Sequence, residues 1–203
     1  MMMHRYKGGR GWEYGYTDGL ITLEREDRPA RTRGEPVTMR TMLDEFGDEL
    51  REASALLRVD LASVMTIVAL ESVPVRRGSP SRDPRSYRWE PKPKDYSAGL
   101  MQTMSRTAAQ MRKKYNLDVP EISETALYVP RTSILCGVAY LRHQADRYDT
   151  RDIMLLQAAY NAGGLYTTKK NEWNLRTHAP DRTARAAAWY NDALTVLSTK
   201  QDL

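Results

Sequence analysis

The stretch that decides the fold is DLASVMTIVALE, which runs from Asp60 to Glu71. Aspartate is a residue type that caps the first turn of a helix, so Asp60 predicts a helix start. The residues that follow are apolar nearly all round the helix, which is typical of a helix buried in a core. Pro74 prevents this helix from continuing far beyond Glu71. The sequence therefore predicts a core helix that ends in a carboxylate.

Amphipathic segments on both sides of this run predict further helices. One begins near Val37 and has an apolar stripe made of Leu43, Phe46, Leu50, Ala53 and Leu57. Another begins at Pro130, because proline suits the first turn of a helix. Its expected inward face contains Ile134, Val138, Leu141, Ala145 and Tyr148.

Three more helices complete the predicted helical part. The first covers about 107–115, and the second runs from a Thr150 cap to Tyr160, where the Gly163-Gly164 pair stops it. The third covers about 183–197. Its expected inward residues are Ala187, Tyr190, Leu194 and Leu197.

Residues 1–36 differ in character from the helical part and are expected to form an extension. The β-prone runs 14–17 and 20–23 flank Asp18-Gly19, a pair that favours a tight hairpin turn. The charged, proline-containing segment 24–36 is typical of a linker. We therefore expect an N-terminal extension with a short β-hairpin over 1–36 and a helical domain over 37–203.

The overall composition excludes some kinds of site but does not identify the function. The chain has 203 residues, a formal net charge of +5 and a pI near 9.3, which draws it toward polyanions. Its single cysteine, Cys136, excludes an internal disulfide and is expected to be buried. Three scattered histidines predict neither a metal site nor a cofactor: His4, His143 and His178. No segment has the ~20 apolar residues of a membrane span.

The segment 73–96 is expected to be a long polar loop. It is rich in proline and basic residues, and loops of this length inside a compact domain are usually functional or disordered. It also contains three carboxylates, Asp83, Glu90 and Asp95, which we expect to be solvated charges that balance the arginines.

Glu71 has two physical interpretations. A carboxylate at the end of an apolar helix is partly desolvated, which raises the pKa of an acid and suits a proton donor near neutral pH. The alternative is a structural glutamate bonded to backbone N–H groups or to a loop arginine. Position alone favours the structural interpretation.

Four short motifs in a fixed order change this balance. They are Glu71-Ser72, then Gly99-Leu100-Met101-Gln102, then Gly137 with Tyr140-Leu141, and finally Ala159-Tyr160-Asn161-Ala162-Gly163. The series resembles the soluble lytic transglycosylase family, which is related to goose-type lysozymes, over about residues 37–197. With the hairpin, the resemblance implies a mainly α fold: a lysozyme-like helical domain with a small N-terminal β-hairpin extension.

Carried over residue by residue, the resemblance implies that Glu71 is the catalytic acid/base. It implies substrate contacts from Ser72, Ser97, Gly99, Met101, Gln102, Met104, Tyr160 and Asn161. Gly99 lets a sugar approach the backbone closely. Gln102 and Asn161 offer donors and acceptors to acetamido and hydroxyl groups. Leu100 is expected to be a core residue. The gap from Glu71 to Gly99, 28 positions (99 − 71), is longer than is usual in the family.

The family's chemistry implies a peptidoglycan lytic transglycosylase. A single glutamate protonates the bond between N-acetylmuramic acid and N-acetylglucosamine and then deprotonates the muramic C6 hydroxyl, which gives a 1,6-anhydromuramyl end without metal or cofactor. Two alternatives stay open. A second carboxylate from Asp83, Glu90 or Asp95 would make the enzyme a hydrolytic muramidase. A basic nucleic-acid-binding protein would use the 73–96 loop with Tyr87 and Trp89.

The expected partner is the peptidoglycan glycan strand, with electrostatic contact to anionic envelope components and no specific nucleic acid. The first ten residues lack the apolar segment of a secretory signal. We therefore expect synthesis in the cytoplasm and action on the cell wall, as in a phage or prophage lysin.

Overall fold

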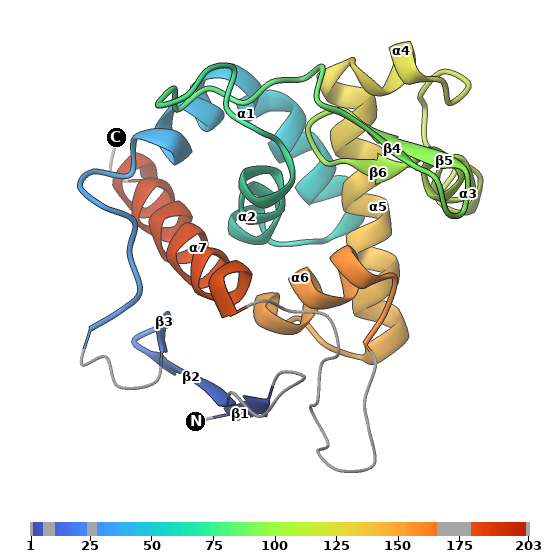
Figure 1. Cartoon of the computed structure of the whole chain (residues 1–203). Helices are drawn as coiled ribbons and strands as arrows, with labels where there is room; N and C mark the ends of the chain where they lie inside the picture. The colour runs from blue at the N-terminus through green and yellow to red at the C-terminus, as the bar shows by residue number, and fades with distance from the viewer. Residues whose placement is uncertain (1, 6–10, 24–27, 166–179, 202–203) are drawn as a thin grey trace. The chain divides into compact units, whose positions relative to one another are not determined.

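The computed structural model describes residues 2–5, 11–23, 28–165 and 180–201 (Figure 1). Within these ranges the chain forms seven helices and six strands. Its contacts divide it into two compact units, residues 37–143 and residues 1–36 together with 144–203. Among the helices described, none is both long and apolar enough to cross a membrane.

The core of the first unit is α2 (Leu61–Glu71), as the opening stretch of sequence predicts. Asp60 caps it by accepting a hydrogen bond from the Ser63 N–H at 2.8 Å. Every residue from Ala62 to Ala69 is buried, so the helix has no solvated face. It packs against α1 (Val37–Leu57), whose predicted apolar stripe is buried along its whole length. Both predictions are confirmed.

Residues 73–86 form the expected loop, but the prediction was wrong for residues 87–96, where a second β-sheet begins. Strands β4 (Tyr87–Glu90), β5 (Asp95–Ala98) and β6 (Thr103–Met104) form an antiparallel sheet in the order β4-β5-β6. Pro74, Pro80 and Pro84 precede β4, and Pro91 and Pro93 occupy the β4–β5 connection, so no proline interrupts the paired residues. Helix α3 (Ser105–Lys114) follows directly and packs against β5 and β6.

The two helices that follow α3 are α4 (Glu124–Leu127) and α5 (Pro130–Tyr148). Pro130 begins α5, as expected, and the helix buries Ile134, Val138 and Leu141. Cys136 lies on the same helix and is fully buried, also as expected. Burial raises the pKa of its thiol to about 12, so a reactive thiolate is not available near neutral pH.

The second unit contains the predicted hairpin. Strands β2 (Gly11–Thr17) and β3 (Leu20–Leu23) pair around Asp18-Gly19, and both turn residues adopt positive φ, as a tight hairpin turn requires. The hairpin prediction is confirmed. A further strand, β1 (Met2–Arg5), pairs with β2 and was not foreseen.

Helix α6 (Ile153–Ala162) is preceded by a capping aspartate and followed by a glycine. Its N-cap is Asp152, which accepts from the Met154 N–H at 2.8 Å, so the predicted Thr150 cap was wrong. The hydroxyls of Tyr14 and Tyr16 also donate to the Asp152 carboxylate. Because of this, one carboxylate caps the helix and connects it to the hairpin. Gly163 ends the helix in the left-handed conformation, as predicted.

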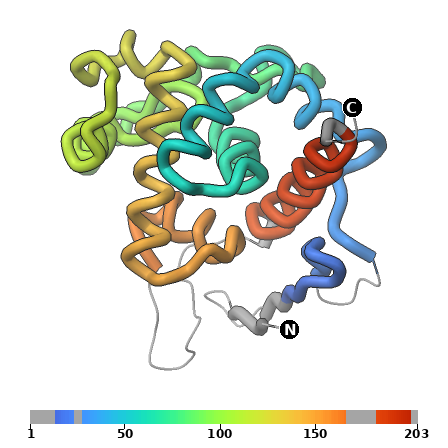
Figure 2. Tube along the Cα trace, turned by 180° about the vertical axis from the view of Figure 1, so that it is seen from behind, coloured from blue at the N-terminus to red at the C-terminus, as the bar shows by residue number. Residues whose placement is uncertain are grey.

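The last helix, α7 (Pro180–Gln201), is longer than expected and buries a different face. Ala187 is buried as expected, but Tyr190, Leu194 and Leu197 were expected to be buried and are only half-buried. The buried positions instead include two polar residues, Asn191 and Asp192. Figures 1 and 2 show the N-terminal segment beside this helix, which contacts β3.

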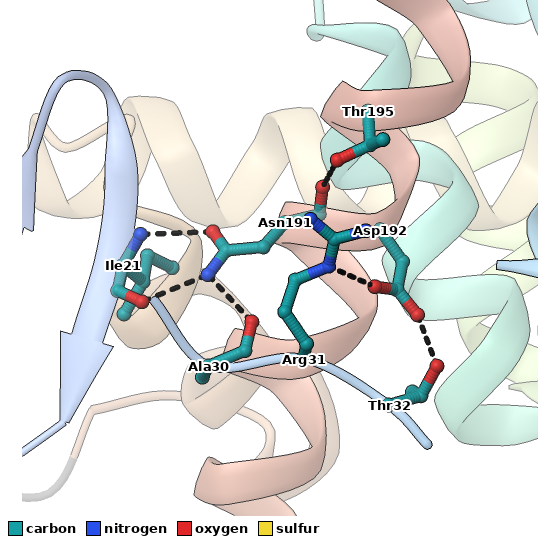
Figure 3. Close-up of polar contacts among 7 residues, drawn as sticks. All are labelled: Ile21, Ala30, Arg31, Thr32, Asn191, Asp192 and Thr195. Atoms are coloured by element: carbon teal, nitrogen blue, oxygen red, sulfur yellow. Dashed lines mark hydrogen bonds and ion pairs between the residues drawn. The ribbon is translucent and has the colours of Figure 1, made fainter. Parts of the chain in front are cut away.

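Hydrogen bonds to the N-terminal segment explain why Asn191 and Asp192 are buried (Figure 3). The Asn191 amide accepts from the Ile21 N–H at 2.8 Å and donates to the carbonyls of Ile21 and Ala30, both at 2.8 Å. The Asp192 carboxylate accepts from Arg31 Nε at 2.9 Å and from the Thr32 hydroxyl. Each buried polar group therefore has partners, as burial requires.

Replacing Asn191 tests this attachment. Asn191→Ala leaves the Ile21 N–H and the two carbonyls without their partner in a buried environment, so we expect a loss of about 2–4 kcal/mol in the free energy of unfolding. Thermal denaturation should show a fall in Tm of about 5–15 °C. Ser198→Ala, an exposed change on the same helix, is the control. Equal melting temperatures for the two variants would contradict the assignment.

Candidate active site

Glu71 lies half-buried at the last position of α2, and Ser72 closes the helix behind it. The Ser72 N–H and hydroxyl both donate to the Val68 carbonyl, at 3.1 and 2.8 Å. Ser72 is buried, so its hydroxyl serves the helix end in this structure. Its predicted contact with substrate stays a prediction. What the geometry establishes is a rigid backbone next to the Glu71 carboxylate.

Arg82 is a residue at this helix end that the sequence analysis treated only as a loop charge. The segment 73–83 doubles back on itself, with the Asp83 N–H donating to the Val73 carbonyl at 3.0 Å. This brings the buried Arg82 guanidinium to the Ser72 carbonyl, which accepts from Nη1 at 2.9 Å. Burial lowers the pKa of Arg82. Nothing in the sequence distinguishes this arginine from the other cations of the segment.

The predicted strip from Gly99 to Gln102 forms a tight turn between β5 and β6. Gly99 has φ +81°, and its N–H donates to the Ser86 carbonyl at 2.9 Å. A Cβ atom at this position would lie 2.0 Å from the Leu127 carbonyl oxygen and 2.4 Å from the Ser133 hydroxyl. Only glycine therefore fits at position 99, because its φ is positive and because no room is left for a Cβ atom.

Gln102 holds this turn with its side chain. Its amide donates to the carbonyls of Ser86 and Gly99, at 2.8 and 3.0 Å. Its Oε1 accepts from the Ser97 hydroxyl at 3.1 Å. Two residues that we expected to bind substrate, Gln102 and Ser97, are thus brought together, and in this structure their polar groups bond to the turn itself.

The two methionines of the strip differ in exposure. Met101 is 0% exposed, packs against Gly137 and donates its N–H to the Ser133 hydroxyl at 3.1 Å. Its side chain therefore lies behind the turn, and we leave it out of the substrate contacts proposed below. Met104 is half-buried at the end of β6, opposite Ser97 in the strand register. Leu100 is buried, as expected.

The three carboxylates of the 73–96 segment have partners of their own. Asp95 is only 5% exposed, so its expected place as a solvated charge was wrong. It accepts from the Ser105 hydroxyl and from the Arg106 N–H at 3.3 Å, and so caps α3, whose Met104 N-cap has no capping side chain. Glu90 pairs with Arg88 at 2.8 Å. Asp83 accepts from the Arg85 N–H at 2.8 Å.

Tyr160 and Asn161 lie in the last turn of α6, in the other compact unit. Tyr160 is buried and Asn161 is exposed, and Gly163 ends the helix two residues later. Their pairing with Glu71 stays a prediction. In the described part of the chain, no group of three or more His, Cys, Asp or Glu side chains is placed to hold a metal ion.

Residues 50–184 match the family model of the transglycosylase SLT domain. The chain belongs to this family. The matched range contains Glu71, the Gly99–Gln102 turn and the Tyr160-Asn161 pair. A comparison with curated proteins gave no match.

Two solved structures of lytic transglycosylases resemble this chain, and the first of them shares its fold. An inactive glutamate-to-glutamine variant of the lytic transglycosylase Slt from Pseudomonas aeruginosa matches 81% of this chain, with 20% identity and a TM-score of 0.56. The 70 kDa soluble lytic transglycosylase of Escherichia coli matches 73% of it, with 21% identity and a TM-score of 0.47. The chain covers 28% and 19% of those two proteins. The expected lysozyme-like helical fold is confirmed.

The Gly99 turn of this SLT domain gives a direct test. Gly99→Ala adds a Cβ into the Leu127 carbonyl and the Ser133 side chain at a positive φ, so we expect a loss of more than about 3 kcal/mol in stability. Gly78→Ala is a matched control. Gly78 has φ +80° but nothing within 4 Å of the position that an added methyl group would take, so this change should cost only about 1 kcal/mol. Chemical denaturation measures both; similar costs would rule out the steric explanation.

Proposed function

We propose that this chain is a peptidoglycan lytic transglycosylase in which Glu71 is the catalytic acid/base. The observation that carries the proposal is the match to the transglycosylase SLT domain over residues 50–184, a range that includes Glu71. The related Pseudomonas aeruginosa enzyme is inactive when a glutamate is replaced by glutamine. Glu71 suits the same role because it ends a buried helix and is itself only half-buried.

The proposed reaction uses one carboxyl group twice. Glu71 donates its proton to the glycosidic oxygen between N-acetylmuramic acid and N-acetylglucosamine, and the bond to the muramic C1 breaks. The Glu71 carboxylate then takes the proton of the muramic C6 hydroxyl, whose oxygen bonds to C1. The products are a 1,6-anhydromuramyl end and a free N-acetylglucosamine 4-hydroxyl, with Glu71 protonated again. We expect glycan contacts from Ser97, Gly99, Gln102 and Met104, and from Tyr160 and Asn161.

Three contacts favour this route over hydrolysis. Hydrolysis needs a second carboxylate to activate water or to attack the sugar. Asp95 is buried as a cap of α3, Glu90 is paired with Arg88, and Asp83 bonds to the Arg85 N–H. Each candidate for a second carboxylate is therefore occupied by a structural contact.

The product ends decide between the two reactions. Purified peptidoglycan digested with this protein should give fragments with 1,6-anhydromuramyl ends, because no water enters the proposed reaction. Mass spectrometry distinguishes these ends from hydrated reducing ends by the mass of one water. Hydrated ends alone would reject the transglycosylase and favour a muramidase.

Substitution of Glu71 tests the catalytic residue. Glu71→Gln keeps the size and hydrogen-bonding capacity of the side chain but removes the proton donor, so we expect release of muropeptides to fall at least about 10³-fold. The melting temperature should change little, because the side chain is only half-buried.

Matched controls for this variant are Asp83→Asn and Glu90→Gln, which remove the other accessible carboxylates of the 73–96 segment. Both should keep activity within about threefold of the parent chain. Full activity of Glu71→Gln, or loss of activity in either control, would overturn the assignment of Glu71 as the single acid/base.

A further inference from the structure

The β4–β5 hairpin has aromatic side chains on one face. Antiparallel register places Trp89 opposite Tyr96, and Tyr87 lies two residues from Trp89, so all three side chains share a face. Tyr87 is 45% exposed and Trp89 is 52% exposed, while Tyr96 is half-buried. We call these three residues the aromatic ledge. Large aromatic side chains this exposed in one group mark an interaction surface.

Contacts within the hairpin fix the orientation of the ledge. The rings of Tyr87 and Tyr96 are stacked, with centroids 5.7 Å apart and an interplanar angle of 26°. This arrangement restricts both rings and leaves the Trp89 indole exposed beside them. An ordered ring loses little conformational freedom when a ligand stacks on it.

The ledge is continuous with the Gly99 turn. Tyr96 is followed on β5 by Ser97 and Ala98, and then by Gly99. On the other strand, the carbonyl of Ser86, directly before Tyr87, accepts from the Gly99 N–H and from the Gln102 amide. The two strands that hold the ledge therefore also hold the turn that we propose as a glycan contact.

The ledge itself is uncharged, and charges of both signs lie around it. Arg88 points to the opposite face of β4, where it pairs with Glu90. On the α4 side, the Glu124 carboxylate accepts from the Tyr128 hydroxyl at 2.6 Å and raises the pKa of Tyr128 to about 12. Arg85 acts on the same hydroxyl in the opposite direction. The three uncharged rings of the ledge fit a neutral ligand with apolar faces.

We propose that the aromatic ledge is an additional sugar-binding subsite, on which an N-acetylhexosamine unit of a glycan strand stacks beyond the Gly99 turn. The inference rests on the proposed function for its choice of a glycan as ligand. The C–H face of a pyranose ring is apolar while its hydroxyls are polar, so it matches rings that have polar tips. The unusual length between Glu71 and Gly99 then has a use, because it contains β4 and all three residues of the ledge.

Substitutions at Trp89 test the subsite without disturbing the core, because the side chain is exposed. Trp89→Ala and Trp89→Leu remove the ring, and Trp89→Leu keeps apolar area. Trp89→Phe keeps a ring of smaller size. The full chain with Glu71→Gln is the background, so that strands are bound but not cut. The probes are the hexamer of N-acetylglucosamine, by calorimetry, and purified peptidoglycan, by co-sedimentation.

We expect the Ala and Leu changes to weaken binding of both probes about tenfold and the Phe change to weaken it less than threefold. Leu56→Ala, an exposed change on α1 in the same unit, should have no effect. Binding by Trp89→Leu equal to that of the parent would overturn the subsite. So would a Trp89 variant that keeps glycan binding while losing affinity for a single-stranded oligonucleotide.

Failure of the subsite is distinguishable from failure of the proposed function. If the parent chain releases anhydromuramyl ends while Trp89→Ala binds glycan normally, the transglycosylase stands and the subsite falls. If the parent chain gives no such ends but its glycan binding depends on an aromatic side chain at position 89, the subsite stands and the proposed chemistry falls.

Discussion

Complete burial of α2 is the constraint on which the first unit depends. A helix without a solvated face must be covered on every side, so the elements around it are fixed in place by its apolar surface. Its last residue, Glu71, is half-buried and reaches solvent at the end of this covered helix. Ser72 and Arg82 then bond to the final turn and to the carbonyl that follows it. These bonds fix the backbone from which the Glu71 side chain extends, and a proton-transfer group must start from a defined position.

In the second unit, polar side chains bond to the N-terminal segment in addition to the apolar burial of residues such as Ile21 and Val196. Asn191 bonds to the backbone of Ile21 and Ala30 as a neighbouring strand would, and Asp192 binds Arg31 and Thr32. Asp152 receives the hydroxyls of Tyr14 and Tyr16 while it caps α6. Through these two sites the N-terminal segment is bonded to the helix that contains Tyr160 and Asn161 and to the last helix of the chain.

Features encoded over a few neighbouring residues could be predicted from the sequence. The Asp60 cap and the Gly163 helix end each follow from one residue, and the buried α2 and the Asp18-Gly19 hairpin follow from short runs of neighbouring residues. Partners distant in sequence could not be predicted. Asp152 was missed in favour of Thr150, Asn191 lay outside an apolar stripe, and Asp95 was predicted to be a surface charge. In each case the position of a polar side chain depends on a hydrogen-bond partner that local periodicity does not reveal.

Strands β4 and β5 could not be predicted for a similar reason, because the 73–98 segment is rich in proline and charged residues, which indicate a loop. Arg82 bonds to the helix end beside Glu71, and the Ser86 carbonyl accepts from the Gly99 N–H. This second contact joins the two ends of residues 87–98, which favours a hairpin between them. Pairing of β4 with β5 forms that hairpin and places every second side chain on one face. Since Tyr87, Trp89 and Tyr96 occupy that face, an exposed aromatic surface follows from how the segment is fixed.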